Sequence, residues 1–423
     1  MNDTENDLDR ALSRQVEHLH GHLVTLPDVK QRARGIQRRR RIAASVSAAA
    51  VVAIIAPIGL MFADNQPDSA PPVSNPTGTT QSPTVNPTKT PTQTPGDNGG
   101  EAPRYDIDLT PPAEGTTGAE PGIPYWFDGQ LVAASGDTVP TDQRIYHPVI
   151  DPTSGQWAGV TFDDQEGTTA WASLDPQGGV LETSPTMADA VAITPDGSSY
   201  AYIAKISPDG PGDPTWTLVK AGGDPQTWDL GTTDSEAPGG GPQGILDDGT
   251  VVFEFESGKP MLAKPDGSIA PLPGKYLRAV DAAPDGRVAV QTSYNDDGTS
   301  CWAVVDLTGD KQATTCDHAL GEFSADGRYV MGYPSGTDGL GASVVSILDA
   351  QTLKPAANFT VPRGAFIWLP MAWSDDTLLA QVWFEGTWRL EHLSLDGVLQ
   401  QRSVAVQADE TAAPFQFGAG PLF

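Results

Sequence analysis

Apolar and polar positions alternate along much of this chain, and each alternating run follows a short Asp-Gly turn. In AAPDGRVAVQ, Asp285-Gly286 precedes the run from Val288 to Gln291. Asp and Gly both tolerate the positive φ of a tight turn, and the alternation has the period of a β-strand. Similar stretches are ITPDGSSYAYIA, ILDDGTVVFEF and FSADGRYVMGY. The pattern predicts one small β-hairpin, written several times.

The spacing of these turns predicts the architecture. They recur in steps of 42, 52, 37, 41 and 49 residues when aligned at Ser154-Gly155, Asp196-Gly197, Asp248-Gly249, Asp285-Gly286, Asp326-Gly327 and Asp375-Asp376. A second hairpin follows each first one, as in WASLDPQGGV and WAVVDLTGDK. Three or four antiparallel strands in about 45 residues are typical of a β-propeller blade. One blade cannot bury both its faces, whereas stacked blades can, so we expect an all-β propeller.

The number of blades depends on how the ring closes. Six units are clear, and residues 122–140 read as three shorter strands. These strands would form a first blade completed by a strand from the end of the chain, either RSVAVQ (402–407) or PFQFG (414–418). The pattern allows six or seven blades and favours seven.

An uncharged run precedes the repeats. Residues 42–63 contain 22 residues without a charge, enough for a helix that crosses a hydrocarbon core of about 30 Å. Basic residues, among them Arg38, Arg39, Arg40 and Arg41, stand just before it. The positive-inside rule then places residues 1–41 in the cytoplasm and the rest outside. A cleaved signal peptide is the alternative, but its basic region would be unusually long.

The segment between the expected span and the repeats has the composition of a linker. Residues 64–103 contain no aromatic residue, nine prolines and eight threonines. Such a segment cannot bury enough apolar surface to fold, so we expect a disordered, extended stalk. The domains expected are a cytoplasmic stub (1–41), a membrane helix (42–63), a stalk (64–103) and a propeller (104–423).

The net charge changes sign at the boundary between the expected membrane helix and the stalk. Residues 1–63 carry a formal charge of +3, and residues 64–423 carry −32. Acidic surface repels the phosphate backbone, so nucleic acid is not an expected partner of the propeller.

Several features resemble known families. The repeat of a turn and a strand, here TPDGSSYAYI and SADGRYVMGY, resembles the TolB-like β-propeller superfamily of extracytoplasmic proteins over residues 155–400. The layout of stub, helix, Thr/Pro stalk and propeller resembles single-pass membrane proteins of actinobacteria, and also membrane-bound anti-sigma factors. The latter resemblance implies that the stub binds a sigma factor, although the zinc-type H-x3-C-x2-C pattern is absent.

Cys301 and Cys316 are the two cysteines of the chain. With Thr308-Gly309 as a two-residue turn, Leu307 pairs with Asp310, and Cys301 then lies directly opposite Cys316. In this register the two form a hydrogen-bonded pair with Cα atoms about 5.5 Å apart. Outside the membrane, opposed cysteines form disulfides, so we expect a structural disulfide rather than a redox or metal site.

Aromatic residues and histidines give no clear site. Trp171, Trp216 and Trp302 share one repeat position and are expected to pack between blades. Five further tryptophans do not share it as a set and are expected to be half-buried, with a ligand surface as the alternative: Trp126, Trp368, Trp373, Trp383 and Trp388. His147, His318 and His392 show no metal-ligand spacing, and His18 and His22 share only a predicted helix face.

No catalytic or cofactor-binding motif is present: there is no G-x-S-x-G, no phosphate-binding glycine loop and no H-E-x-x-H. We therefore expect a non-enzymatic binding or sensing module at the cell surface, without cofactor or metal. Its ligand would be a protein, a glycan or a small molecule. The alternatives are an anti-sigma-like regulator and a propeller-based hydrolase or lyase.

The stub has one apolar seam, formed by Leu12, Val16, Leu19, Leu23 and Leu26 at helical spacing. Such a seam fits three roles: dimerisation, contact with the membrane surface, or docking of a cytoplasmic partner of residues 1–41.

Overall fold

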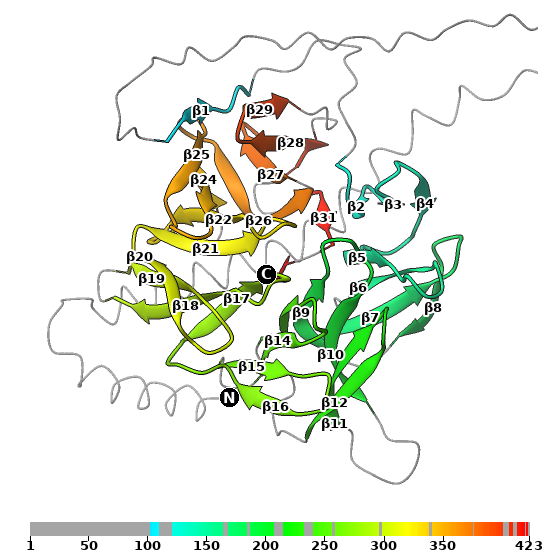
Figure 1. Ribbon diagram of the computed structural model, residues 1–423. Helices are drawn as coiled ribbons and strands as arrows, with labels where there is room; N and C mark the ends of the chain where they lie inside the picture. The colour runs from blue at the N-terminus through cyan, green and yellow to red at the C-terminus, as the bar shows by residue number, and fades with distance from the viewer. Residues whose placement is uncertain are drawn as a thin grey trace, which may run out of the picture. The chain divides into compact units, whose positions relative to one another are not determined.

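The computed structural model describes one compact unit of the chain, within residues 85–423 (Figure 1). The described residues are 102–109, 121–163, 168–183, 187–206, 215–231, 240–255, 259–295, 298–337, 341–374, 376–400, 406–408, 413–418 and 420–421. Within these ranges, no helix has the length and apolar character needed to span a membrane. The expected stub, membrane helix and nearly all of the stalk lie outside them, as do Arg38, Arg39, Arg40, Arg41 and the seam of the stub.

The described residues form seven sheets, arranged around a common centre (Figure 1). The first contains β31 (Gln416–Phe417), β2 (Tyr125–Phe127), β3 (Gln130–Val132) and β4 (Thr138–Pro140). The second contains β5 (Tyr146–Ile150), β6 (Trp157–Asp163), β7 (Thr168–Leu174) and β8 (Val180–Thr183). The third contains β9 (Met187–Ile193), β10 (Tyr200–Ile206), β11 (Thr215–Ala221) and β12 (Gln226–Gly231), with β32 (Gly420–Pro421) beside β9.

The remaining sheets follow in chain order. The fourth contains β13 (Pro242–Ile245), β14 (Val251–Glu254), β15 (Pro260–Ala263) and β16 (Ile269–Pro271). The fifth contains β17 (Arg278–Ala282), β18 (Val288–Tyr294), β19 (Ser300–Val305) and β20 (Lys311–Thr315). The sixth contains β21 (His318–Phe323), β22 (Tyr329–Pro334), β24 (Val344–Asp349), β25 (Pro355–Thr360) and β1 (Arg104–Asp106). The seventh contains β23 (Gly341–Ala342), β26 (Phe366–Ser374), β27 (Thr377–Phe384), β28 (Thr387–Ser394), β29 (Gly397–Gln400) and β30 (Val406–Gln407).

The turns expected from the sequence join the first two strands of each unit. Asp285-Gly286, for example, connects β17 to β18, where the N–H of Gly286 donates to the carbonyl of Ala283 at 3.0 Å. Gly286 has φ of 92°, a backbone region that favours glycine, and Gly155, Gly197, Gly249 and Gly327 also have positive φ. The predicted hairpin repeat is confirmed.

The hydrophobic core is divided among the interfaces between neighbouring sheets. One cluster joins the third and fourth sheets through Trp216 and Phe253. Another joins the fifth and sixth through Trp302 and Phe323. Corresponding clusters lie at the other five interfaces, including that between the seventh and first sheets. Each sheet therefore buries both faces against its neighbours, as expected for stacked blades of a β-propeller.

The end of the described chain closes the ring. β31 pairs antiparallel with β2, through Phe417 with Tyr125 and Gln416 with Trp126. Of the two closing segments that the sequence offered, residues 414–418 thus complete the first sheet. Residues 406–407 instead pair with β28 of the seventh sheet.

The start of the described chain adds a strand that the repeat pattern did not predict. β1 pairs in parallel with β25, the outermost repeat strand of the sixth sheet, through Tyr105 with Phe359. The two rings stack at 5.5 Å, and the Tyr105 hydroxyl donates to the carbonyl of Leu395 at 2.8 Å. The segment after the stalk is therefore bound between the sixth and seventh sheets.

Candidate functional site

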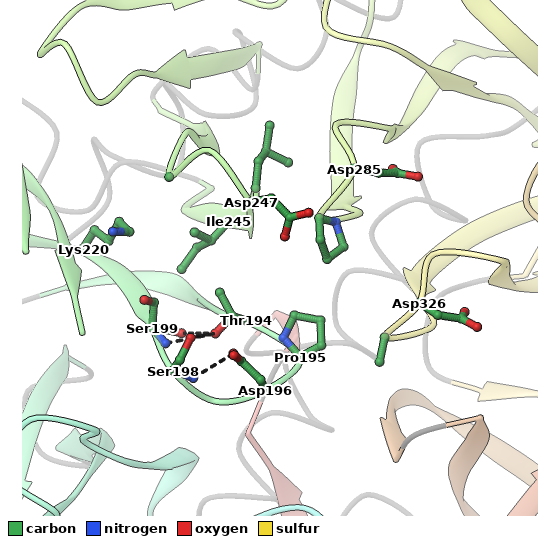
Figure 2. Close-up of a pocket in the computed structure, with 14 residues that line it drawn as sticks. Thr194, Pro195, Asp196, Ser198, Ser199, Lys220, Ile245, Asp247, Asp285 and Asp326 are labelled. Atoms are coloured by element: carbon green, nitrogen blue, oxygen red, sulfur yellow. Dashed lines mark hydrogen bonds between the residues drawn. The ribbon is translucent and has the colours of Figure 1, made fainter. Parts of the chain in front are cut away.

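A cavity of about 490 Å³ lies where the Asp-Gly turns of four successive sheets meet (Figure 2). Its lining comes from the turns that follow β9, β13, β17 and β21, the innermost strands of the third to sixth sheets. Four carboxylates line it, one from each of these turns: Asp196, Asp247, Asp285 and Asp326. The repeat thus places one acidic group per sheet at the same opening.

Three of the four carboxylates accept hydrogen bonds within their own turns, and Asp285 does so from the N–H of Arg287 at 3.3 Å. Asp196 accepts a hydrogen bond from the N–H of Ser198 at 2.9 Å (Figure 2), and this bond is the main reason why its pKa is lowered. Asp326 accepts from the N–H of Arg328 at 2.9 Å. Burial acts to raise the pKa of Asp326, but the bonds from Arg328 and Ser324 outweigh it and lower the pKa. Asp196 and Asp326 are therefore carboxylates at neutral pH.

Arginines neutralise two of the carboxylates. Arg287 forms an ion pair with Asp285 at 2.6 Å and also donates to the carbonyl of Gly327 at 2.6 Å. Arg328 forms an ion pair with Asp326. Asp285 and Asp326 thus bring little net charge to the cavity.

Asp247 differs from the other three because, among the described residues, its carboxylate neither accepts a hydrogen bond from its own turn nor pairs with an arginine. Its backbone N–H donates to the carbonyl of Pro284 at 2.9 Å, which fixes the turn against the next sheet. Its side chain is exposed, and within the described ranges no group donates to it or pairs with it. Asp247 is therefore the carboxylate best placed to meet a ligand.

One buried cation lines the same cavity. Lys220, on β11, is 6% exposed, and its ammonium donates to the carbonyl of Asp224 at 3.0 Å. An ammonium has three donors, so it can also bond to an acceptor in the cavity. The hydroxyl of Thr194 donates to the carbonyl of Ser199 at 3.1 Å and accepts from the N–H of Ser199 at 2.9 Å (Figure 2). These two bonds fix the turn that forms this side of the cavity.

Carboxyl groups also join neighbouring sheets: the side chain of Glu254 is buried and that of Asp281 is half-buried. Glu254 of β14 accepts from the N–H of Ala279 on β17, and Asp281 of β17 accepts from the N–H of Phe323 on β21 at 2.6 Å. Burial raises the pKa of both to about 7. Burial, followed by the charge of Asp281, raises the pKa of Glu322 well above its usual range. Glu254 and Asp281 thus link neighbouring sheets, and none of the three carboxyl groups lines the cavity.

Cys301 and Cys316 are joined by a disulfide, with Cα atoms 4.0 Å apart. The hairpin that brings them together differs from the two-residue turn expected. The N–H of Asp306 donates to the carbonyl of Asp310 at 3.1 Å, so three residues form the turn and the register slips by one. A bulge between Val304 and Val305 restores the expected register, so Cys301 again lies opposite Cys316. The expected separation of about 5.5 Å between their Cα atoms was wrong.

The tryptophans take packing positions. Trp171, Trp216 and Trp302 are 6%, 0% and 3% exposed, as expected for residues between sheets. Trp388 is fully buried, and its ring meets that of Trp368 edge-on at 5.9 Å. Trp126, Trp368, Trp373 and Trp383 are half-buried. None of these tryptophans lines the cavity.

The histidines of the described part lie apart from the cavity: His147 and His392 are buried, and His318 is half-buried. Within that part, no three His, Cys, Asp or Glu side chains are placed to hold a metal ion. His18 and His22 lie outside the described residues.

The sequence reasoning missed the cavity and Asp247. The repeated Asp-Gly turn was the available signal, because equivalent turns of stacked units must lie on one face. It was interpreted as turn chemistry alone.

Comparisons with known proteins leave the activity open. No protein-family model and no curated protein match the chain. Among solved structures it is similar to TolB from Acinetobacter baumannii, with 16% identity and a TM-score of 0.34, over 54% of this chain and 61% of TolB. The chain thus spans less than two thirds of TolB.

Two further structures are enzymes by name. An acylaminoacyl peptidase from Pyrococcus horikoshii has 11% identity and a TM-score of 0.41, over 65% of this chain and 47% of that one. An oligogalacturonate lyase from Vibrio parahaemolyticus has 14% identity and a TM-score of 0.38, over 62% and 81%. With TM-scores below 0.5, these similarities decide nothing about what the chain does.

Proposed function

We propose that this chain is a membrane-anchored, extracytoplasmic β-propeller of the TolB-like kind, with seven blades, that binds a ligand without transforming it. The cavity lined by the turns of four successive sheets carries the proposal. Seven sheets with a core cluster at each interface support the blade count. The hydroxyl of Thr194 bonds to its own turn and not to a base, which favours binding over catalysis.

The charges of the cavity indicate the chemistry of the ligand. Two of its four carboxylates are paired with arginines, whereas Asp196 and Asp247 are not, so these two negative charges outnumber the one lining cation, Lys220. A carboxylate that must bind a partner from solution favours a cationic donor, and hydrogen bonds to charged groups are worth about 1.5–3 kcal/mol. Residues 64–423, which include the propeller, carry a formal charge of −32 and therefore also attract cations. The ligand proposed is a peptide or amine that places an ammonium group beside Asp247.

Binding of a lysine peptide tests this proposal. We expect the full chain, purified in detergent, to bind acetylated trilysine amide at low salt, more weakly as salt rises. Asp247→Asn removes the unpaired charge and should weaken binding about tenfold. Asp142→Asn is the matched control, because Asp142 is also exposed but lies between β4 and β5, outside the cavity.

Isothermal titration calorimetry on the three proteins gives the answer. Equal loss in Asp247→Asn and Asp142→Asn would mean that the peptide senses only net charge. No binding to the wild-type chain, or tighter binding of triglutamate, would refute a cationic ligand.

The proposed topology has its own test. Residues 42–63 would span the membrane once, with Arg38, Arg39, Arg40 and Arg41 inside and the propeller outside. Protease added to intact cells should then cut within residues 64–103 and release a folded propeller, while residues 1–41 stay protected. A propeller that resists protease until the cells are lysed would contradict this orientation.

A further inference from the structure

Beyond the closing strand, residues 420–421 lie toward the centre of the ring as β32. β32 pairs antiparallel with β9, through Gly420 with Val191 and Pro421 with Ala190. The opposite edge of β9 pairs with β10, so β32 takes the edge that faces the centre. In Figure 1 the red segment beyond β31 lies there, beside the label C.

This segment reaches across the opening. β32 lies within 8 Å, measured between Cα atoms, of residues in both β9 and β26. β9 belongs to the third sheet and β26 to the seventh, and these two sheets are not neighbours in the ring. The segment therefore occupies the central opening itself and not an interface between two blades.

The edge of β9 is built to accept an added strand. β9 contains a bulge, because Val191 pairs with Tyr202 and Met187 pairs with Ala204. Ala190 has no partner on β10 and pairs only with Pro421. A bulge leaves backbone groups outside the regular ladder, and an innermost edge that stays unpaired can bind another extended chain.

Residues 420–421 are bound to β9 less firmly than the closing segment is bound to the seventh sheet. Among the residues that the structure describes here, Gly420 and Pro421 pair with β9, and Pro421 has no backbone N–H to donate. Gly418 fits closely, since a Cβ there would lie 3.1 Å from the carbonyl oxygen of Pro148. Phe415, by contrast, is bonded on both its N–H and its carbonyl by Gln381. Residues 420–421 can therefore leave while the ring stays closed.

We propose that the inner edge of β9 is a docking site for an extended peptide segment of a partner protein, which residues 420–421 fill by default. The partner segment adds antiparallel to β9 and displaces β32, so binding is strand addition. The sequence of the resident segment, Gly-Ala-Gly-Pro, indicates small residues in the partner. This site is separate from the cavity around Asp247 and does not depend on a cationic ligand.

A variant lacking residues 419–423 tests the site with a labelled peptide that copies residues 418–423. The variant should bind this peptide, and the full chain should bind it at least tenfold more weakly, because a tethered segment competes at an effective concentration near millimolar. A copy that is N-methylated at every residue except proline is the control, since it cannot donate to the edge. Equal binding by both proteins, or no binding by a variant that unfolds like wild type, would overturn the proposal.

A cross-link tests the same site without truncation. Val191 and Gly420 lie directly opposite each other, so Val191→Cys with Gly420→Cys should form a disulfide on mild oxidation. The cross-linked chain should not bind the peptide, and Val191→Cys alone should bind it as the full chain does. Failure of the double variant to cross-link would show that the segment does not occupy the edge, and a cross-linked chain that still binds would place the peptide elsewhere.

Discussion

Gln381 is the side chain that ties the closing segment to the seventh sheet. It is 1% exposed, its amide donates to the carbonyl of Phe415 at 3.0 Å, and its oxygen accepts from the N–H of Phe415 at 3.1 Å. Gln381→Met keeps the length of the side chain but leaves both backbone groups of Phe415 buried without a partner. Each such group costs about 1–3 kcal/mol, so we expect a loss of about 2–6 kcal/mol in the free energy of unfolding.

This loss in the free energy of unfolding corresponds to a fall in the melting temperature, Tm. For a propeller of about 320 residues, an unfolding entropy of about 2.1 cal/mol/K per residue gives a fall of about 3–9 °C in Tm. Gln416→Met is the control, because among the described residues the side chain of Gln416 bonds only to the carbonyl of Ala413, three residues away, and its loss should shift Tm by less than about 2 °C. Differential scanning calorimetry on the full chain in detergent measures both. Equal shifts in the two variants would refute the role of Gln381 in closing the ring.

Other expectations concern buried acids and the disulfide. Burial raises the pKa of Glu254 and Asp281 to about 7 and of Glu391 to about 8, so the folded chain keeps protons that the unfolded chain releases above about pH 4. Stability should therefore fall as pH rises from 5 to 8, and Glu254→Gln should reduce this slope in thermal unfolding; a Tm that rises over this range would contradict the reasoning. Cys301 and Cys316 should resist alkylation until reductant is added, and reduction should cost about 3 kcal/mol for a loop of 15 residues. Alkylation before reduction, or an unchanged Tm after it, would contradict the disulfide.

Local chemistry explains what the sequence predicted. The period of two and the Asp-Gly turns are properties of a few adjacent residues, so the strands from β5 to β28 could be recognised without any knowledge of the ring. The shared position of Trp216 and Trp302 likewise predicted their burial between sheets. The pairing of Cys301 with Cys316 was also predicted, although the slip at Asp306 and its compensating bulge were not.

The site depends on contacts that no local pattern contains. The aligned turns singled out Asp248, which accepts a hydrogen bond from the N–H of Thr250 at 2.8 Å. Its neighbour Asp247 lines the cavity instead, because the fourth sheet presents that residue to the turns of the fifth and sixth. The pairing of β1 with β25 and of β32 with β9 joins segments far apart in the chain. Only the closed ring brings these residues together.

A crystal structure of the full chain grown with acetylated trilysine amide tests the central claim most directly. That claim is that the face bearing the Asp-Gly turns binds a cationic ligand. The account predicts an ammonium group of the peptide within hydrogen-bond distance of the Asp247 carboxylate, inside the cavity lined by Asp196, Asp285 and Asp326. Peptide density on any other surface, with that cavity holding only solvent, would contradict it.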